Sequence, residues 1–330
     1  MLTLPIIEQL LARFPDLRVG VLGDLFLDRY LDLDARLTEP SLETGLPAYQ
    51  VVRVRAQPGA AGTVINNLAA LGVGRIVPLA LIGDDGEGYE LRQALAALPA
   101  VDTRLVRSWP ERRTPTYTKP MLMEPGQPAR ELNRLDIKNR TPTPPQAQAW
   151  LTQTLTEIWP QVDAWIVLDQ VSEVDCGVVT ASVMARLAEL AAAEPTKFVL
   201  ADSRERIDQF RNVCLKPNRR EAGDLDRLRQ NATRDIYLTD GPAGIRLYRP
   251  GAAEPLTVPA YPVSGPIDPV GAGDSTSAGI TLARAAQASP EVAAAFGNLI
   301  ASITIQQLGT TGTATPTQVR ERWRELAPSL

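Results

Sequence analysis

Hydrophobic and polar residues follow two alternating patterns along most of the chain. Short apolar, β-branched runs predict buried strands at 18–23, 75–83, 163–169, 198–202, 212–216 and 235–239. Amphipathic or alanine-rich segments between them predict helices at 58–72, 87–98, 146–157 and 180–193. A strand–helix–strand rhythm needs crossover connections, so the pattern predicts an α/β protein with a mostly parallel central sheet flanked by helices.

Two other zones, at about 29–57 and 103–135, consist of short, proline-containing pieces in which apolar and polar residues alternate. Such alternation is typical of strands with one face in water. The two zones can pair as a small sheet over the site, so we predict one domain over residues 1–330 with a β-strand lid. Surface hairpins without a function are the alternative. Exposed edge strands invite pairing, and we therefore expect a homodimer formed through the lid.

Composition excludes several classes of function. The 330 residues are 44% hydrophobic and 22% charged with a net charge of −4, which is typical of a soluble protein and gives no electrostatic attraction to nucleic acid. Histidine is absent, and this excludes Ser–His–Asp catalysis and histidine-ligated zinc. Carboxylates must therefore carry out any proton transfer.

Cysteine content and the N-terminal segment bear on the compartment. Cys176 and Cys214 are too few for a disulfide framework, and we expect buried thiols in a reducing environment. Residues 1–16 contain Pro5, Glu8 and Pro15, a pattern that fits a leading amphipathic helix rather than a secretion signal or a membrane span. The expected location is cytoplasmic, with no membrane partner.

A glycine-rich turn, Gly271–Ala272–Gly273, leads directly into a small-residue helix predicted over 275–285. Its glycines allow backbone conformations that a Cβ would forbid, and the unpaired N–H groups at a helix start bind anions. Asp274 lies at this N-terminus as a carboxylate able to take a proton from a hydroxyl that attacks a phosphoryl group. A role as a simple N-cap is the alternative for Asp274.

Polar residues also gather where the predicted strands end. Asp24 and Asp28 follow the first strand, and further clusters occur at Asp169–Gln170, Asp202–Arg204, Pro217–Asn218 and Thr239–Gly241. In an open α/β sheet, ligands bind in the crevice beyond the carboxyl ends of the strands. We therefore expect these clusters to share one cleft.

Several motifs, in this order along the chain, resemble those of the ribokinase-like (PfkB) carbohydrate kinases. Gly271–Asp274, with Asp268 upstream, resembles the C-terminal signature of that family, and Asn218–Glu221 matches its Asn-x-x-Glu motif. Thr239–Gly244 is similar to its nucleotide-binding turn, and 58–72 to the paired-glycine segment that opens its second helix. The resemblance covers essentially the whole chain and implies a ribokinase-like α/β fold.

The resemblance also implies roles for the matching residues. Asp274 is the expected catalytic base, with the amides of Gly271, Ala272 and Gly273 holding the transferring phosphate. The expected nucleotide-binding residues are Asn218, Glu221, Thr239, Gly241, Gly244 and Asn298, of which Asn218 and Glu221 also organise Mg²⁺, through water. The expected sugar-binding residues are Asp24, Asp28, Gly59 and Asn67. Asp268 is the candidate for a monovalent cation, K⁺.

Within the family, Gly23–Tyr30 and Leu132–Asp136 look most like the heptose-phosphate kinase domain of ADP-heptose synthesis enzymes. Three departures from the family pattern bear on substrate choice and cation binding. Thr63 replaces a usual asparagine, Gln170 stands where the heptose kinases carry a tyrosine, and Pro269–Val270 replaces a frequent Thr–Thr pair.

The predicted function is transfer of the γ-phosphoryl group of ATP to a hydroxyl of a sugar or sugar phosphate, with Mg²⁺ as cofactor. Lys119 and Arg134 in the second lid zone are candidates for binding a substrate phosphate, although exposed basic residues are often simply solvated. Two alternatives stay open at this point. One is a nucleoside kinase of the same fold, and the other is a non-catalytic sugar- or nucleotide-binding relative.

Overall fold

The computed structural model describes residues 2–326; Met1, the first residue of the expected leading helix, lies outside the described residues. Within that range, one large sheet has nine strands. In spatial order they are β16 (Leu256–Val258), β15 (Ile245–Tyr248), β14 (Ile236–Thr239), β13 (Cys214–Leu215), β12 (Phe198–Ser203), β11 (Ala164–Asp169), β1 (Arg18–Gly23), β6 (Arg75–Gly83) and β7 (Val106–Trp109). All pairs from β14 to β7 are parallel, and β15 and β16 extend the sheet antiparallel.

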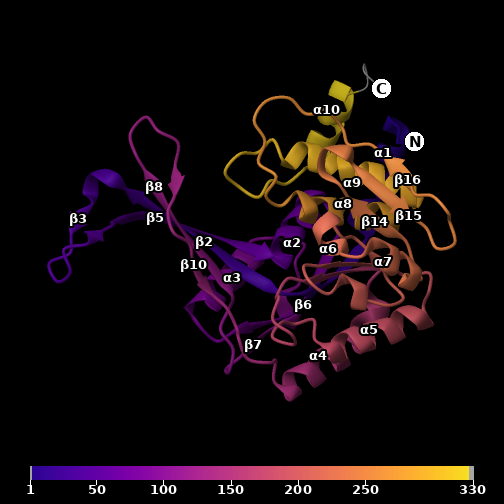
Figure 1. Cartoon of the computed structure of the whole chain (residues 1–330), viewed down its shortest axis with the longest axis horizontal. Coiled ribbons are helices and arrows are strands. Elements are labelled where there is room, and N and C mark those ends of the chain that lie inside the picture. The colour runs from indigo at the N-terminus through magenta and orange to yellow at the C-terminus, as the bar shows by residue number, and fades with distance from the viewer. Residues whose placement is uncertain (1, 327–330) are drawn as a thin grey trace.

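Helices cover both faces of this sheet (Figure 1). They are α1 (Leu4–Arg13), α2 (Ala61–Ala70), α3 (Gly86–Ala96), α4 (Pro145–Ile158), α5 (Ala181–Ala193), α6 (Arg219–Ala222), α7 (Leu225–Asn231), α8 (Ala272–Ala285), α9 (Pro290–Thr304) and α10 (Pro316–Leu326). No helix between residues 2 and 326 is long and apolar enough to cross a lipid bilayer.

Alternating side chains of the buried strands supply two separate cores, one on each face. In β11, Ile166 packs with the helices α1, α2, α8 and α9, whereas Trp165 and Val167 pack with α4 and α5. Successive side chains of a strand point to opposite faces, so a strand buried on both sides must be apolar throughout. This is why the predicted parallel strands appear in the sequence as continuous apolar runs. Both cysteines are buried free thiols, as expected.

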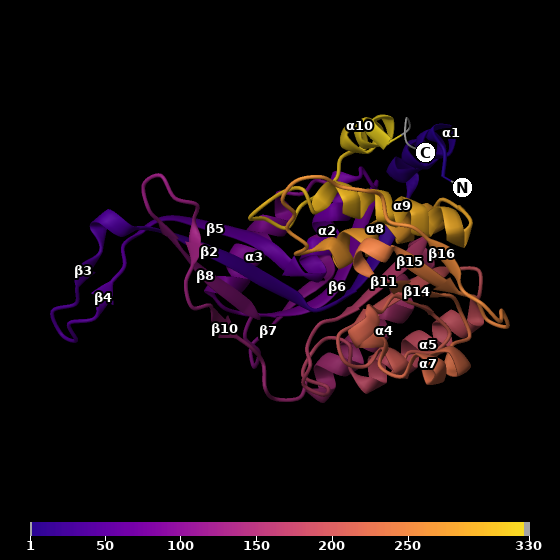
Figure 2. The same cartoon turned by 45° about the horizontal axis from the view of Figure 1, so that its top comes forward.

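A second, smaller sheet projects from one side of the body as the lid (Figure 2). Its strands are β2 (Leu25–Asp34), β5 (Val51–Ala60), β8 (Thr116–Met123), β9 (Arg130–Glu131) and β10 (Leu135–Ile137). A hairpin of β3 (Glu39–Pro40) and β4 (Pro47–Ala48) extends furthest from the body. The lid differs from the expected boundaries in two respects. It begins at Leu25, and β7 from the second zone joins the large sheet because it pairs with β6.

Close packing of α8 on α9 fixes where α8 begins. A Cβ on Gly279 of α8 would lie 3.0 Å from the Cα of Gly297 in α9, and a Cβ on Gly297 would lie 2.9 Å from Ile280. Two helices can approach this closely only where the contact residues lack side chains. The pair of glycines therefore lets α8 lie deep between α9 and the sheet, with its first turn at the carboxyl ends of the strands.

We expect Gly279→Ala to destabilise the fold by about 1–3 kcal/mol, because the added methyl overlaps backbone atoms that cannot move independently. Gly86→Ala is the matched control, since it also lies in a helix and a Cβ there meets nothing within 4 Å. Chemical denaturation of both variants measures the difference. A destabilisation equal to that of Gly86→Ala would contradict the packing argument.

Candidate active site

A cavity of about 940 Å³ opens beyond the carboxyl ends of β12, β13 and β14, next to the first turn of α8. Predicted site residues that line it are Asn218, Glu221, Thr239, Gly241, Gly244, Gly271, Ala272, Gly273, Asp274 and Asn298. These residues come from four separate stretches of the chain. Part of the shared cleft expected from the polar ends of the strands is therefore present.

The turn before α8 has the conformation that its glycines allow. Gly271 is the N-cap residue with φ 81°, in the left-handed region, and Ala272 begins the helix. Asp274 is the third helical residue rather than the cap, and the cap itself is held by no side chain. The alternative in which Asp274 serves only as the N-cap is therefore wrong, and its carboxylate lines the cavity.

The electrostatic surroundings of Asp274 change its pKa strongly. Burial and the nearby Asp202 carboxylate raise its pKa to about 7, although Lys216 and Arg204 oppose the shift. A general base works best when its pKa lies near the operating pH. Perturbed carboxylates of this kind in a cleft are typical of functional sites.

Lys216 and Asp202 are functional candidates that the motif analysis did not assign. The Lys216 Nζ lies 2.9 Å from Asp202 Oδ2, and both side chains are almost fully buried. Ser277 of α8 also donates a hydrogen bond to Asp202 at 3.2 Å. The sequence signal for both was their place at the end of a buried strand, which marked Asp202 as part of a polar cluster but gave Lys216 no role.

Asn218 and Glu221 form a reciprocal cap on α6. Asn218 Oδ1 accepts from the Glu221 N–H at 2.9 Å, and Glu221 Oε2 accepts from the Asn218 N–H at 2.9 Å. One oxygen of Glu221 therefore stays available to the cavity, and burial, together with Asp202, raises its pKa. The described residues contain no cluster of three metal-ligating side chains, so these residues fit a cation held largely by water and phosphate oxygens.

The end of the cavity next to α9 is mostly apolar. Asn298 of α9 donates to the carbonyls of Val258 and Pro259, both at 3.0 Å, and so fixes the start of the segment that forms the wall. This wall was missed by the motif analysis, because its residues carry no polar signature: Ala260, Tyr261, Pro262, Val263 and Ile267. Gly244 has φ 88° and lies against Val258 O, where a side chain would not fit.

Asp24 lies beside the cavity but outside its lining. Its carboxylate accepts hydrogen bonds from the backbone N–H groups of Gln170, Val171 and Val178, at 3.0, 3.3 and 2.7 Å. Burial and the Asp169 carboxylate raise the pKa of Asp24 to about 6, against the effect of these three bonds. In this structure Asp24 therefore anchors the 170–178 segment. Gln170 of this segment lines the cavity.

Asp28, Gly59 and Lys119 meet on one face of the lid. Lys119 Nζ lies 3.8 Å from Asp28 Oδ2 and donates to the Tyr30 hydroxyl at 3.2 Å. Gly59 provides the space for Asp28, because a Cβ there would lie 2.7 Å from its carboxylate carbon. Burial raises the pKa of Asp28, and the Lys119 ammonium opposes this shift.

The other predicted residues make contacts with the protein itself. Arg134 pairs with Asp136 at 2.7 Å and lies over the Tyr117 ring. Asn67 is fully buried in α2, where it donates to Thr63 O at 2.9 Å. Asp268 accepts from the N–H groups of Val270 and Gly309, both at 3.1 Å, and thereby joins two loops of the site.

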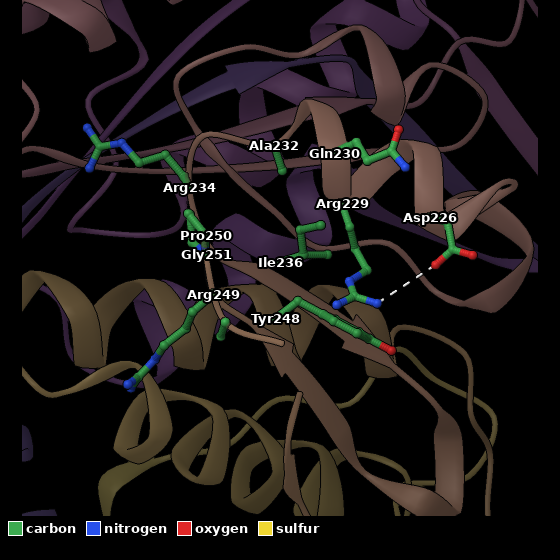
Figure 3. A pocket seen from close by; sticks show the side chains of 11 residues that line it. Asp226, Arg229, Gln230, Ala232, Arg234, Ile236, Tyr248, Arg249, Pro250 and Gly251 are labelled. Atoms are coloured by element: carbon green, nitrogen blue, oxygen red, sulfur yellow. Dashed lines mark ion pairs between the residues drawn. The ribbon is translucent and has the colours of Figure 1, made fainter. Parts of the chain in front are cut away.

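A second cavity, of about 550 Å³, lies at the other end of β14, next to α7 (Figure 3). Arg229 lies over the Tyr248 ring there and within 3.8 Å of Asp226. Its lining contains none of the predicted site residues. Of these two cavities, only the first is lined by predicted site residues.

Comparisons with known proteins bear on the family and the fold. A profile of the pfkB family of carbohydrate kinases matches residues 30–318. The bifunctional protein HldE of Trichlorobacter lovleyi is 28% identical over an alignment that covers 95% of this chain and 64% of that protein. The HldE of a Caulobacter species is 31% identical, with coverages of 92% and 62%. The chain thus spans less than two thirds of the length of these relatives.

Among solved structures, a carbohydrate kinase from Agrobacterium tumefaciens superposes with a TM-score of 0.67 at 18% identity, covering 93% of this chain and 97% of that one. Arabidopsis thaliana ribokinase, complexed with ribose and ATP, gives 0.64 at 16% identity, with coverages of 93% and 99%. The expected ribokinase-like α/β fold is confirmed. Since the family profile also matches most of the sequence, the chain belongs to the pfkB family of carbohydrate kinases, which are phosphotransferases that act on a hydroxyl group.

Proposed function

We propose that the protein transfers the γ-phosphoryl group of ATP to a hydroxyl of a phosphorylated sugar of the heptose 7-phosphate type. The observation that carries this proposal is the partly buried Asp274 carboxylate in the first turn of α8, directly after the Gly271–Ala272–Gly273 turn. The Ala272 N–H donates to Pro269 O at 3.1 Å within this turn, which leaves the amides of Gly271 and Gly273 as the proposed phosphate donors. A base next to amide donors at a helix start suits attack of a hydroxyl on a phosphoryl group. The likeness to the HldE proteins supports the heptose part of the proposal.

Asp274 takes the proton of the attacking hydroxyl as the new oxygen–phosphorus bond forms. The N–H groups at the start of α8 then hold the oxygens of the transferring group, because the positive end of the helix dipole faces it. Mg²⁺, bound through the phosphates, water and the side chains of Asn218 and Glu221, would neutralise phosphate charge. The apolar wall from Ala260 to Ile267 suits the adenine base.

The acceptor is proposed to bind between the lid and the 170–178 segment. Asp28 on the lid and Asp24 beneath it supply acceptors for sugar hydroxyls, since each carboxylate can accept more bonds than the protein itself provides. Lys119 and Arg134 are the cations proposed to bind a substrate phosphate. The chain's partial coverage of its relatives limits the proposal to the kinase reaction.

Asp268 is our candidate site for K⁺. Both of its oxygens already accept a backbone N–H, and a bound cation would use their remaining lone pairs next to the loops that shape the start of α8. A homodimer through the lid is a further part of the proposal. It is supported by the edge position of β5 and by its exposed apolar residues Val51, Val52 and Val54.

We expect Asp274→Asn to lower kcat by about 10²–10⁴-fold while Mg·ATP still binds, because the amide cannot accept the proton. The measurement is ADP release across a panel of sugars, sugar phosphates and nucleosides, heptose 7-phosphate included, with calorimetry for ATP. Asp226→Asn, in the second cavity, is the matched control and should turn over normally. Turnover with nucleosides alone would replace the sugar assignment. Nucleotide binding without turnover on a widened panel would instead indicate a non-catalytic relative.

The raised pKa of Asp274 predicts opposite effects of pH on activity and on stability. Activity should rise with pH through about 7, since the base must be ionised. Stability should fall over the interval from about 3.8 to 7, because the folded state binds this proton more tightly than the unfolded state does. Thermal unfolding should therefore show Asp274→Asn gaining stability over the wild type from pH 5 to pH 8. A constant difference between the two proteins would contradict the burial argument.

For the dimer, we expect the wild type to have about twice the 35.8 kDa mass of the chain in light scattering. The double substitution Val52→Lys and Val54→Lys should yield monomers, because like charges would face each other along the paired edges. Val174→Lys introduces the same charge at an exposed apolar residue elsewhere and should leave the mass unchanged. An unchanged mass for the double variant would exclude the lid edge as the interface.

A further inference from the structure

The Lys216 ammonium occupies an electrostatically unusual position. Lys216 directly follows β13, and its side chain is only 4% exposed. A Cβ built on Gly273 would lie 3.6 Å from Nζ, so the ammonium lies in contact with the first turn of α8. The positive end of a helix dipole disfavours a cation at this place. A buried cation beside a helix N-terminus therefore needs an anion between them to be stable.

The Asp202 carboxylate supplies negative charge on one side of the ammonium. Asp202 Oδ2 is 2.9 Å from Nζ, and it is the one carboxylate within 4.0 Å of this ammonium among residues 2–326. This ion pair, at hydrogen-bond distance, stabilises the charged form of the lysine. An ammonium has three N–H donors, and Asp202 does not use all of them.

We propose that Lys216 is a catalytic residue that binds the γ-phosphoryl group of ATP, with Asp202 as the positioning residue that holds its ammonium against the start of α8. This inference rests on the proposed kinase function. During transfer, the bond between the γ-phosphorus and the β,γ-bridging oxygen breaks, the bond to the acceptor oxygen forms, and the acceptor proton goes to Asp274. Lys216 keeps its proton throughout and contributes charge alone.

Arg204 and Arg220 are the other cations in the cavity lining, and both are exposed. Arg204 Nε donates to Gln170 Oε1 at 2.7 Å, and Arg220 lies 3.4 Å from Glu205. Both guanidinium groups are therefore held at the surface. Lys216, in contrast, is buried and fixed by an ion pair, which is the preorganisation that stabilisation of a developing charge requires.

The experiment compares nucleotide binding by Lys216→Met with that by Lys197→Met. Lys197 is also buried, and its ammonium also contacts a carboxylate, Glu194, at 3.4 Å, but it bonds Trp159 O away from the cavity. Calorimetry with Mg·ATP and with Mg·ADP gives the ratio of the two affinities. Lys216→Met should weaken ATP binding by about 10-fold or more relative to ADP, because a charged hydrogen bond to the γ-phosphate is lost. Lys197→Met should leave the ratio unchanged.

A second readout tests whether the Lys216 charge acts on Asp274. Loss of this positive charge raises the pKa of Asp274, so the acidic limb of the pH–rate profile should move to higher pH in Lys216→Met. The limb should stay in place in Lys197→Met, whose ammonium lies away from the cavity. The ATP-to-ADP ratio, rather than this limb, separates γ-phosphate binding from a structural role. If Lys216→Met does not fold, the double variant Lys216→Met with Asp202→Asn removes both buried charges and is measured instead.

The outcomes distinguish this inference from the proposed function. Selective loss of ATP affinity supports the role of Lys216. A wild type that binds both nucleotides and turns over, with an unchanged ATP-to-ADP ratio in the variant, overturns the role of Lys216 alone. Equal weakening of ATP and ADP also overturns it. A wild type that binds neither nucleotide overturns both proposals.

Discussion

The position of the α8 N-terminus is the constraint on which the site depends. Two glycines, Gly279 and Gly297, let α8 lie against α9 at a distance that side chains would prevent. Asp202, at the end of β12, accepts from Ser277 in the second turn of α8 and also pairs with Lys216 at the end of β13. One buried carboxylate thus fixes the helix, the two strand ends and the ammonium relative to each other, and it does so next to Asp274.

The balance of charge around this helix end explains what the site complements. Asp202, Glu221 and Asp274 outnumber the single buried ammonium, and burial raises the pKa of both Glu221 and Asp274. The carboxylates would repel an isolated polyphosphate, and the helix end and the lysine would repel an isolated divalent cation. A nucleotide that carries its own Mg²⁺ places negative charge near the lysine and the helix end and positive charge near the carboxylates. The raised pKa values of Glu221 and Asp274 also mean that their charged forms destabilise the folded state. Functional sites commonly retain destabilising groups of this kind.

The sequence predicted the large sheet well, and it predicted residues that do gather in one cavity, because both depend on local signals. Apolar runs identify strands buried on two faces, and the Gly271–Gly273 turn before a small-residue helix indicates a candidate anion site by its own backbone chemistry. The lid boundaries were less accurate, since the pairing of β7 with β6 is a long-range choice that alternation alone cannot encode. Lys216 and the wall from Ala260 to Ile267 were missed because their roles arise only from neighbours that are distant in sequence.

Gln170 is a departure from the family pattern, and it changes the contacts on the side of the cavity where the acceptor is proposed to bind. Gln170 receives the Arg204 guanidinium through its side chain and donates its backbone N–H to Asp24. A tyrosine at this position would place an aromatic ring there and would lack the amide oxygen that now orients Arg204. On the opposite side, Gln57 of the lid donates to Thr311, whose methyl group lies beside Gly271. The lid and the 170–178 segment therefore border the cavity through different residues, and the departure from the family pattern lies on the side that carries Gln170 and Arg204.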